Sequence, residues 1–197
     1  MEQVQMEQLQ EFWTDSRKEK YEKAMNQVIA MICEMDAEYA KKNGYHFIRF
    51  IEKRLKTPES IWGKINRKNK EVSFAEIETC ISDLAGIRII CFDIEQVYEA
   101  ICMIRASKKF SVLQVKDYIR KPKDNGYQSF HMLLSVDDLK IEVQLRTILM
   151  DAWSSLDSIL IYKKKEPISK ELQADIHKFA KWSRKMDKLV HRMLKRR

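Results

Sequence analysis

Residues 116–146 read KDYIRKPKDNGYQSFHMLLSVDDLKIEVQLR, and the rest of the fold can be worked out from this stretch. A basic loop ends in Asn125-Gly126-Tyr127 and leads into an apolar segment that carries His131. Alternate residues of a strand point to the same face. The next segment therefore places polar side chains on one face, namely Glu142, Gln144 and Arg146, and apolar ones on the other, namely Ile141, Val143 and Leu145. Two strands beside a cationic loop with an exposed aromatic ring suit a phosphorylated ligand with a flat ring.

Helix and strand signals alternate along the remaining chain. Residues 1–42 have a helical period that stops at Asn43-Gly44, and the apolar stripe Phe47, Ile48, Ile51 and Leu55 continues it. Thr57 followed by Pro58 predicts the start of a helix that runs to about Asn66, and Ser73 predicts another that ends near Ser82. Residues 85–92 and 111–116 read as strands, and residues 94–107 and 148–162 as helices. A break at Pro167 precedes a long final helix.

This mixture predicts an α/β or α+β fold with a single mixed β-sheet flanked by helices. We expect one globular domain with three parts. Residues 1–44 form an N-terminal helical segment, residues 45–165 the core, and residues 166–197 a basic amphipathic C-terminal helix.

The composition narrows the class of protein. Hydrophobic residues make up 45% of the chain, and the net charge is +8, which favours nucleotides, RNA or other polyanions as partners. No signal peptide or apolar run of membrane-spanning length is present, so we expect a cytoplasmic protein that does not enter a membrane. The cysteines lack metal-binding spacing and are expected to be buried thiols, namely Cys33, Cys80, Cys91 and Cys102.

Two carboxylates are candidate metal ligands. Asp83 comes just before the Gly86 turn into a buried strand, and Glu142 lies on the strand described above. Mg²⁺ prefers one or two carboxylates together with substrate phosphates, so these two acids would suffice. The alternative is that Asp83 merely caps the turn and pairs with Arg88 on the surface.

A basic cluster surrounds the Thr57-Pro58 turn and could hold a triphosphate, namely Arg54, Lys56, Lys64 and Arg67. An ordinary solvated face is the alternative for these cations. Tyr127 could equally pack on the sheet as a rim aromatic, and His131 could be a hydrogen-bonded core histidine. The helical spacing of Trp153 and Tyr162 predicts core positions.

Four ordered segments carry a resemblance to a known family. RLKTPESIWGKINRK, SDLAGIRIICFD, KDYIRKPKDNGYQSFH and EVQLRTILMDAWSSLDSILIYKK resemble, in order and spacing, the synthetase domain of the RelA/SpoT family. The likeness is greatest to its stand-alone small alarmone synthetases and covers about residues 47–164. It implies a nucleotidyltransferase-like fold. The metal-binding residues of the family's hydrolase half are not found, so its opposing activity is not expected.

The resemblance implies a GTP/GDP pyrophosphokinase that moves the β,γ-diphosphate of ATP to the 3′-hydroxyl of GDP or GTP. Arg54 and Arg88 would sandwich adenine, and the ATP phosphates would contact Lys56, Lys64 and Arg67. Asp83 would coordinate Mg²⁺, with Glu142 as second ligand and as base toward the 3′-hydroxyl. Tyr127 would stack on guanine, and the acceptor's phosphates and ribose would contact Lys123, His131, Gln144 and Arg146.

The chain departs from the family pattern at three places. Gln128 stands where an arginine is usual, Asp157-Ser158 replaces a Glu-His pair, and Lys53 replaces a glycine. The final helix adds a basic stripe beside an apolar one. Three hypotheses follow: a (p)ppGpp synthetase, a toxin-like enzyme that pyrophosphorylates the 3′ end of tRNA and is neutralised by an antitoxin, and a catalytically inactive RNA- or nucleotide-binding module. The apolar stripe could also pair two subunits into a homo-oligomer.

Overall fold

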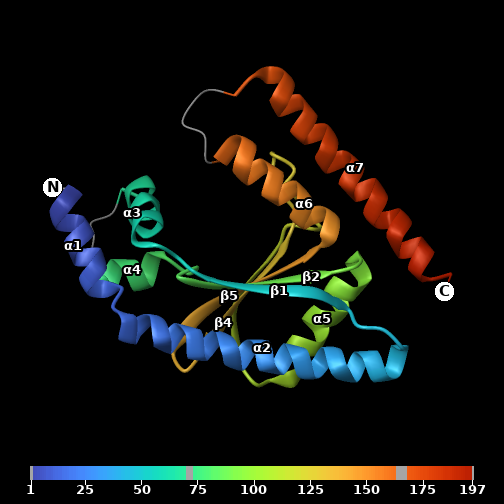
Figure 1. Ribbon diagram of the computed structural model, residues 1–197, viewed down its shortest axis with the longest axis horizontal. Coiled ribbons are helices and arrows are strands. Elements are labelled where there is room, and N and C mark those ends of the chain that lie inside the picture. The colour runs from blue at the N-terminus through green and yellow to red at the C-terminus, as the bar shows by residue number, and fades with distance from the viewer. Residues whose placement is uncertain (1, 70–72, 163–167, 197) are drawn as a thin grey trace.

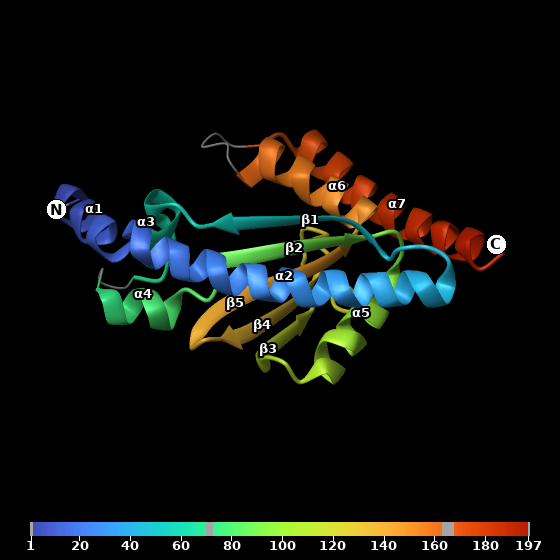
Figure 2. The same cartoon turned by 60° about the horizontal axis from the view of Figure 1, so that its bottom comes forward.

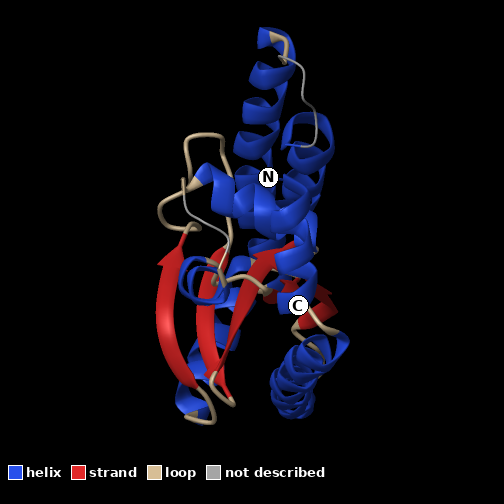
Figure 3. Ribbon diagram, turned by 90° about the vertical axis from the view of Figure 1, so that its left-hand side faces the viewer, coloured by secondary structure: helices blue, strands red, loops and turns tan. Residues whose placement is uncertain are grey.

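The computed structural model describes residues 2–69, 73–162 and 168–196. In this part of the chain five strands form one sheet in the order β1-β2-β5-β4-β3. Figure 2 shows this order, with α2 crossing in front, and in Figure 3 the strands are seen side by side. The strands are β1 (Ile48–Leu55), β2 (Ala85–Cys91), β3 (Ser111–Asp117), β4 (Phe130–Val136) and β5 (Leu139–Thr147). Since β2 and β5 are parallel and the other pairs antiparallel, the predicted mixed sheet is confirmed.

Helices cover both faces of the sheet. The long α2 lies along one side, whereas α6 and α7 lie on the other (Figure 1). The helices are α1 (Glu2–Phe12), α2 (Asp15–Asn43), α3 (Pro58–Arg67), α4 (Phe74–Cys80), α5 (Ile94–Ser107), α6 (Ile148–Asp157) and α7 (Lys170–Leu194). The N-terminal and C-terminal helices of the predicted architecture are therefore present.

The main hydrophobic core lies on the face of the sheet that α2 and α5 cover. Strand β5 contributes the side chains predicted for this face, and all three are fully buried, namely Ile141, Val143 and Leu145. Helix α2 contributes Val28 and Ile32 to the same cluster. A smaller cluster joins α6 to α7 through Trp153 and Ile176. Burying the apolar face on α2 leaves the polar face of β5 free to line a site.

Local helix signals act as expected. The Thr57 and Ser73 hydroxyls accept hydrogen bonds from the first turns of α3 and α4, and Pro58 is the first residue of α3. Gly44 ends α2 in the left-handed conformation, with φ of 80°, and donates its N–H to the Ala40 carbonyl.

The helical stripe predicted for residues 47–55 is wrong, because this segment is strand β1. It pairs antiparallel with β2, with Arg54 opposite Gly86 and Glu52 opposite Arg88. Ile51 and Leu55 are four residues apart, and this spacing returns a side chain to the same face in both a strand and a helix. The pattern alone could not separate the two, and the pairing partner decides.

Two helices differ from their predicted extents. The segment predicted as one helix contains two, α1 (Glu2–Phe12) and α2 (Asp15–Asn43), separated at Trp13 and Thr14, where the Thr14 side chain caps α2. Helix α6 ends at Asp157, and a π-helical turn, η1 (Ser158–Tyr162), continues it. The predicted break at Pro167 and the side chain of Tyr162 lie outside the described residues, whereas Trp153 is buried as predicted.

The prediction of four buried thiols is wrong for two of them. Cys91 is buried and Cys80 is half-buried, but Cys33 and Cys102 are exposed on α2 and α5. Both helices are amphipathic at the sheet surface, so an apolar sequence context does not guarantee an inward position. None of the helices within the described ranges combines the length and hydropathy needed to cross a bilayer.

Candidate functional site

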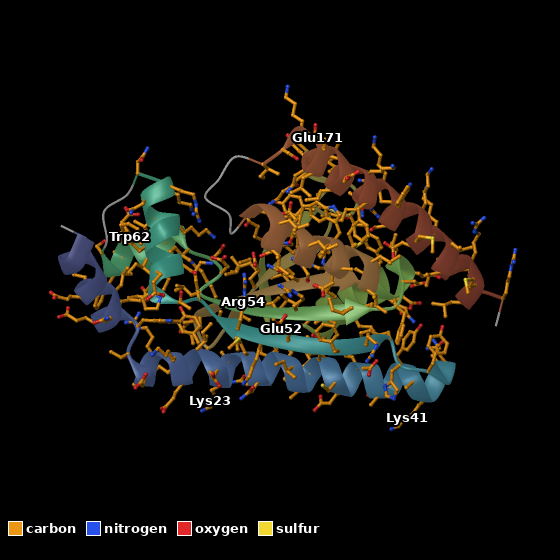
Figure 4. The ribbon with its side chains drawn as sticks, turned by 45° about the horizontal axis from the view of Figure 1, so that its top comes forward. Lys23, Lys41, Glu52, Arg54, Trp62 and Glu171 are labelled. Atoms are coloured by element: carbon orange, nitrogen blue, oxygen red, sulfur yellow. The ribbon has the colours of Figure 1, made fainter. Side chains whose placement is uncertain are left out.

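The strand register brings polar residues from distant segments into rows across the sheet. Arg54, Gly86 and Glu142 lie side by side on β1, β2 and β5. The next row runs from Glu52 through Arg88 and Gln144 to His131. Figure 4 shows Arg54 on the side of the sheet away from α2, whose Lys23 and Lys41 point outward. The polar face predicted from β5 alone is thus extended over four strands.

A cavity of about 640 Å³ opens above this face, between the sheet and α6. It brings together six predicted binding residues, namely Arg54, Arg88, Lys123, Tyr127, Gln144 and Arg146. Two atoms of its lining, Arg88 Nε and Asp157 Oδ1, are buried without a hydrogen-bond partner. Because buried polar atoms are nearly always satisfied, these two indicate a polar ligand or water in the cavity.

Asp83 is held by two lysines of the predicted phosphate cluster. Its Oδ2 lies 2.8 Å from Lys56 Nζ, and its Oδ1 lies 2.7 Å from Lys64 Nζ. Burial raises the pKa of Asp83, but the hydrogen bonds and charges of both lysines outweigh it and lower the pKa to about 2. The alternative pairing of Asp83 with Arg88 is not what forms. The result is a carboxylate, ionised at neutral pH, between two cations. A metal ion can replace a lysine at this carboxylate, and the released lysine can then contact a phosphate.

Lys56 itself is fixed by the N-terminal segment. Its carbonyl accepts a 2.7 Å hydrogen bond from the Trp13 indole, and its N–H donates to the Leu84 carbonyl. Arg67 ends α3 three residues after Lys64 and is exposed, outside the described lining of the cavity. The predicted basic cluster is therefore divided. Arg54 lines the cavity, whereas the other three cations lie outside its described lining, Lys56 and Lys64 beside Asp83 and Arg67 at the end of α3.

Glu142 is oriented by its neighbours on the sheet. His131 Nδ1 lies 3.2 Å from Glu142 Oε1, and Gln144 donates to Oε2 at 2.6 Å. Burial raises the pKa of Glu142, the interactions with His131 and Gln144 lower it, and the net shift is downward. The negative charge of Asp83 also raises the pKa of Glu142, so Asp83 is close enough to influence Glu142 electrostatically. That the two carboxylates hold one metal ion stays a prediction.

Tyr127 is half-buried, and its hydroxyl is the centre of a network. The Tyr127 Oη lies 2.7 Å from His131 Nε2 and accepts from Arg146 Nη2 at 2.7 Å. Its ring meets Trp153 edge-on, and Lys123 Nζ lies 4.8 Å from the ring centre. His131 thus joins Tyr127 to Glu142, a role that its place in an apolar strand did not reveal.

Asp151 is a member of the site that the sequence reasoning missed. Its Oδ1 lies 3.3 Å from Arg146 Nη1 and 3.5 Å from Arg88 Nη1. One carboxylate in the first turn of α6 therefore joins an arginine from each half of the site. An acidic residue in the first turn of a helix is common, so the only available signal was its position just after β5.

Helix α7 covers the loop that carries Tyr127. Gly126 has φ of 91°, and a Cβ on it would lie 2.6 Å from the Ala180 Cβ. His177 Nε2 lies 3.0 Å from the Asp124 carbonyl oxygen. Gln128, one of the three departures, is buried and accepts a hydrogen bond from Arg184 Nε. The C-terminal helix thus helps to position the loop that carries Tyr127.

The other two departures occupy different surroundings. Lys53 points toward α2, where its Nζ lies 3.2 Å from Glu22 Oε2, and so faces away from the cavity. Asp157 and Ser158 line the cavity, and burial raises the pKa of Asp157. Of the three, the Asp157-Ser158 pair can contact a ligand directly.

The sequence as a whole was compared with known proteins. Residues 53–167, more than half of the chain, match the family described as "Region found in RelA / SpoT proteins". The chain belongs to the RelA/SpoT family. It is 34% identical to the GTP pyrophosphokinase YwaC of Bacillus subtilis over 158 residues, covering 76% of this chain and 75% of the relative. It is 27% identical to the GTP pyrophosphokinase YjbM of the same organism, covering 85% and 82%.

Solved structures of RelA/SpoT-family synthetases share the fold. The small alarmone synthetase 2 of Bacillus subtilis matches with a TM-score of 0.77 at 30% identity, covering 90% of this chain and 96% of that one. The small alarmone synthetase 1, bound to its product pppGpp, matches with a TM-score of 0.79 at 25% identity, covering 92% and 98%. The predicted resemblance to the stand-alone small alarmone synthetases is confirmed.

Proposed function

We propose that this RelA/SpoT-family protein is a GTP pyrophosphokinase that makes (p)ppGpp from ATP and GDP or GTP. The cavity that brings donor-side and acceptor-side residues together between the sheet and α6 is the observation that supports this most directly. In the reaction, the acceptor 3′-oxygen forms a bond to the β-phosphorus of ATP, and the bond from that phosphorus to the α,β-bridging oxygen breaks. AMP leaves with the bonding electrons, and the 3′-hydroxyl proton must be taken up.

The donor nucleotide would lie over β1 and β2. Arg54 and Arg88 come from neighbouring strands, and the guanidinium planes of arginine stack well on a flat base. Lys56 and Lys64 would hold the ATP phosphates beside Asp83, with Arg67 reaching them from the end of α3. Phosphoryl transfer depends mainly on positioning and on charge neutralisation, and these cations supply both.

The acceptor would lie over β5 and the loop before β4. Tyr127 would stack on guanine, and the acceptor's phosphates and ribose would contact Lys123, His131, Gln144 and Arg146. Asp151 forms ion pairs with Arg146, on the proposed acceptor side, and with Arg88, on the proposed donor side. Two nucleotides bound in this way would place the 3′-hydroxyl near Glu142.

Asp83 and Glu142 fit a Mg²⁺ ion. Both are ionised at neutral pH and near enough to influence each other's charge, and hard carboxylate oxygens are the ligands that Mg²⁺ prefers. When bound, the ion would neutralise the charge of the transferred diphosphate. Glu142, kept unprotonated by His131 and Gln144, would accept the proton of the 3′-hydroxyl. The proposed substrates place the reaction in the cytoplasm.

One surface favours a second candidate, a toxin-like enzyme that pyrophosphorylates tRNA. A cavity of about 600 Å³ beside α7 is lined by six cations, namely Arg120, Lys178, Lys181, Arg184, Lys185 and Lys188. Trp182 lines it too and is 54% exposed, and stacking beside cations suits single-stranded nucleic acid. The exposed apolar stripe of α7 could in turn meet an antitoxin or a second subunit through Trp182, Met186, Leu189 and Met193.

Incubation with γ-labelled ATP and Mg²⁺, in parallel with GDP, GTP or bulk tRNA, separates these candidates. We expect label in guanosine nucleotides, and the same yield after the cavity-lining Lys178, Lys181, Lys185 and Lys188 and the terminal Arg192, Lys195, Arg196 and Arg197 are replaced with Gln. Label in tRNA alone, lost on that replacement and falling steeply with salt, would establish the second candidate instead. No label with any acceptor, and nucleotide binding unchanged in Asp83→Asn, would indicate an inactive binding module.

A further inference from the structure

A second cluster of ligand-type side chains lies outside the lining of the cavity described above, where the start of α5 meets the end of α7. His191 Nδ1 lies 2.9 Å from Asp93 Oδ2 and 3.4 Å from Glu95 Oε2. One nitrogen and two carboxylate oxygens, all within 4.8 Å of one another, are thus offered by two helices nearly a hundred residues apart. Asp93 is buried, whereas His191 is partly exposed and Glu95 is exposed.

A buried and incompletely paired carboxylate stands beside this cluster. Asp187 lies one turn before His191 on α7 and has no exposed surface. Its Oδ2 accepts a hydrogen bond from Thr147, but its Oδ1 has no partner. Glu95, Asp187 and His191 line the same cavity of about 750 Å³. Burial raises the pKa of Asp187 to about 6 despite the Thr147 hydrogen bond, and the charge of Asp93 raises it as well.

One imidazole nitrogen and two carboxylate oxygens that converge in a partly buried place form a ligand set for a metal cation. We propose that Asp93, Glu95 and His191 bind a divalent transition metal of the Zn²⁺ class, with Asp187 accepting a hydrogen bond from a metal-bound water. Imidazole nitrogen and carboxylate oxygen are ligands of Zn²⁺. Ligands about 2.0 Å from a tetrahedral ion are about 3.3 Å apart, close to the separations of His191 Nδ1 from the two oxygens.

Cationic side chains near the three ligands limit the affinity of the site for zinc. Lys185, Lys188 and Arg192 line the cavity, and Lys195 Nζ lies 3.4 Å from Glu95 Oε1, so Lys195 competes with a metal for the charge of Glu95. These cations also repel a metal ion. The site is therefore expected to bind zinc more weakly than a fully buried structural zinc site does.

Metal binding here would fix α7 against α5. Asp93 caps α5 through its Oδ1, which accepts from the Gln96 N–H, so its Oδ2 remains available as a ligand. On helix α7, Ala180 packs against Gly126, and Arg184 donates a hydrogen bond to Gln128. A metal that joins α7 to α5 would thus stabilise the helix that covers the acceptor loop.

The test is a Zn²⁺ titration of the full chain, freed of metal by a chelator and kept in excess Mg²⁺ to occupy the catalytic carboxylates. All variants carry Cys33→Ser and Cys102→Ser, because exposed thiols bind zinc themselves. Competition with a chromogenic zinc indicator reports stoichiometry and affinity, and thermal unfolding reports the stabilisation. We expect one Zn²⁺ per chain and a rise in Tm, with affinity lowered on the order of tenfold or more in His191→Gln.

Control variants show whether zinc binds at the proposed cluster or elsewhere on the protein. His46→Gln removes a histidine that pairs with a single carboxylate, Asp36, and should bind zinc as the parent does. Asp93→Ser keeps the helix cap but removes a ligand, and the exposed Glu95→Gln cannot prevent folding. Equal binding by the parent, His191→Gln and Glu95→Gln, or no binding by the parent, would overturn the proposal. The cluster would then be a helix contact in which His191 and Lys195 pair with the acids and no metal binds.

Discussion

Lys64 Nζ lies 2.7 Å from Asp83 Oδ1, so the carboxylate proposed to bind Mg²⁺ is joined to a lysine proposed to bind ATP. Both side chains are partly shielded from solvent, with 27% and 16% of their surface exposed. The pair holds the lysine in place before the nucleotide arrives. When ATP and its metal bind, Lys64 can turn from the carboxylate to a phosphate without leaving a buried charge unpaired.

Asp83→Asn should lower diphosphate transfer on the order of a thousandfold or more, because the diphosphate charge loses a metal ligand. Initial rates with labelled ATP and GDP measure this loss. Asp175→Asn, an exposed position on α7, is the control and should keep the parent rate. A folded Asp83→Asn protein with near-normal turnover would disprove the proposed role.

The same substitution has a pH signature in stability. The pKa of Asp83 lies at about 2 in the folded protein and ordinarily at 3.8, so the ionised group stabilises the fold above about pH 4. This contribution, about 2 kcal/mol, is lost as the pH falls toward 2. Urea unfolding of the parent and Asp83→Asn should differ at pH 6, and the gap should narrow by roughly half at pH 3. A gap that does not change with pH would contradict the low pKa.

Tyr127 combines a stacking surface with an anchored hydroxyl. Tyr127→Phe removes the contacts to Arg146 and His131 but keeps the ring, so we expect a loss of about 1 kcal/mol in kcat/KM for the acceptor. Tyr127→Ala should cost about 1 to 3 kcal/mol more, the usual worth of base stacking. Steady-state kinetics with varied GDP measure kcat/KM for each variant. Equally small losses in Tyr127→Phe and Tyr127→Ala would mean that the ring does not stack on the acceptor.

Asp151→Asn should weaken both halves of the site at once. Without the charge, Arg88 and Arg146 lose a shared partner, although Glu52 and Tyr127 still contact them. We expect the KM values for ATP and for GDP both to rise by about three- to tenfold, which corresponds to about 1 kcal/mol each. A rise confined to one nucleotide would show that Asp151 serves only one arginine.

Gly126→Ala tests whether α7 must lie against the acceptor loop. Alanine is strained at φ of 91°, and its Cβ would meet Ala180 at 2.6 Å, so α7 or the loop must shift. Gly44→Ala is the matched control, since Gly44 has a similar φ of 80° but nothing within 4 Å of an added Cβ. Thermal unfolding should show a loss of about 1 kcal/mol for Gly44→Ala and of about 2 to 4 kcal/mol for Gly126→Ala. Acceptor KM should rise only in Gly126→Ala.

The sequence alone determined much of this protein. Period-2 alternation placed Glu142, Gln144 and Arg146 on one face of a strand, and the caps at Thr57 and Ser73 placed two helix starts. These signals are local, because they depend on backbone geometry within a few residues. The ordered motifs added the family, and with it the residues worth examining.

Only the tertiary structure decided what those residues contact. The apolar spacing of residues 47–55 predicts a helix because it fits both the helical and the strand period. Antiparallel pairing with β2 makes this segment strand β1. The placement of Asp83 between Lys56 and Lys64, the link from Tyr127 through His131 to Glu142, and the bridge of Asp151 join segments far apart in the chain. Such contacts are set by sheet register and helix packing, which no local pattern encodes.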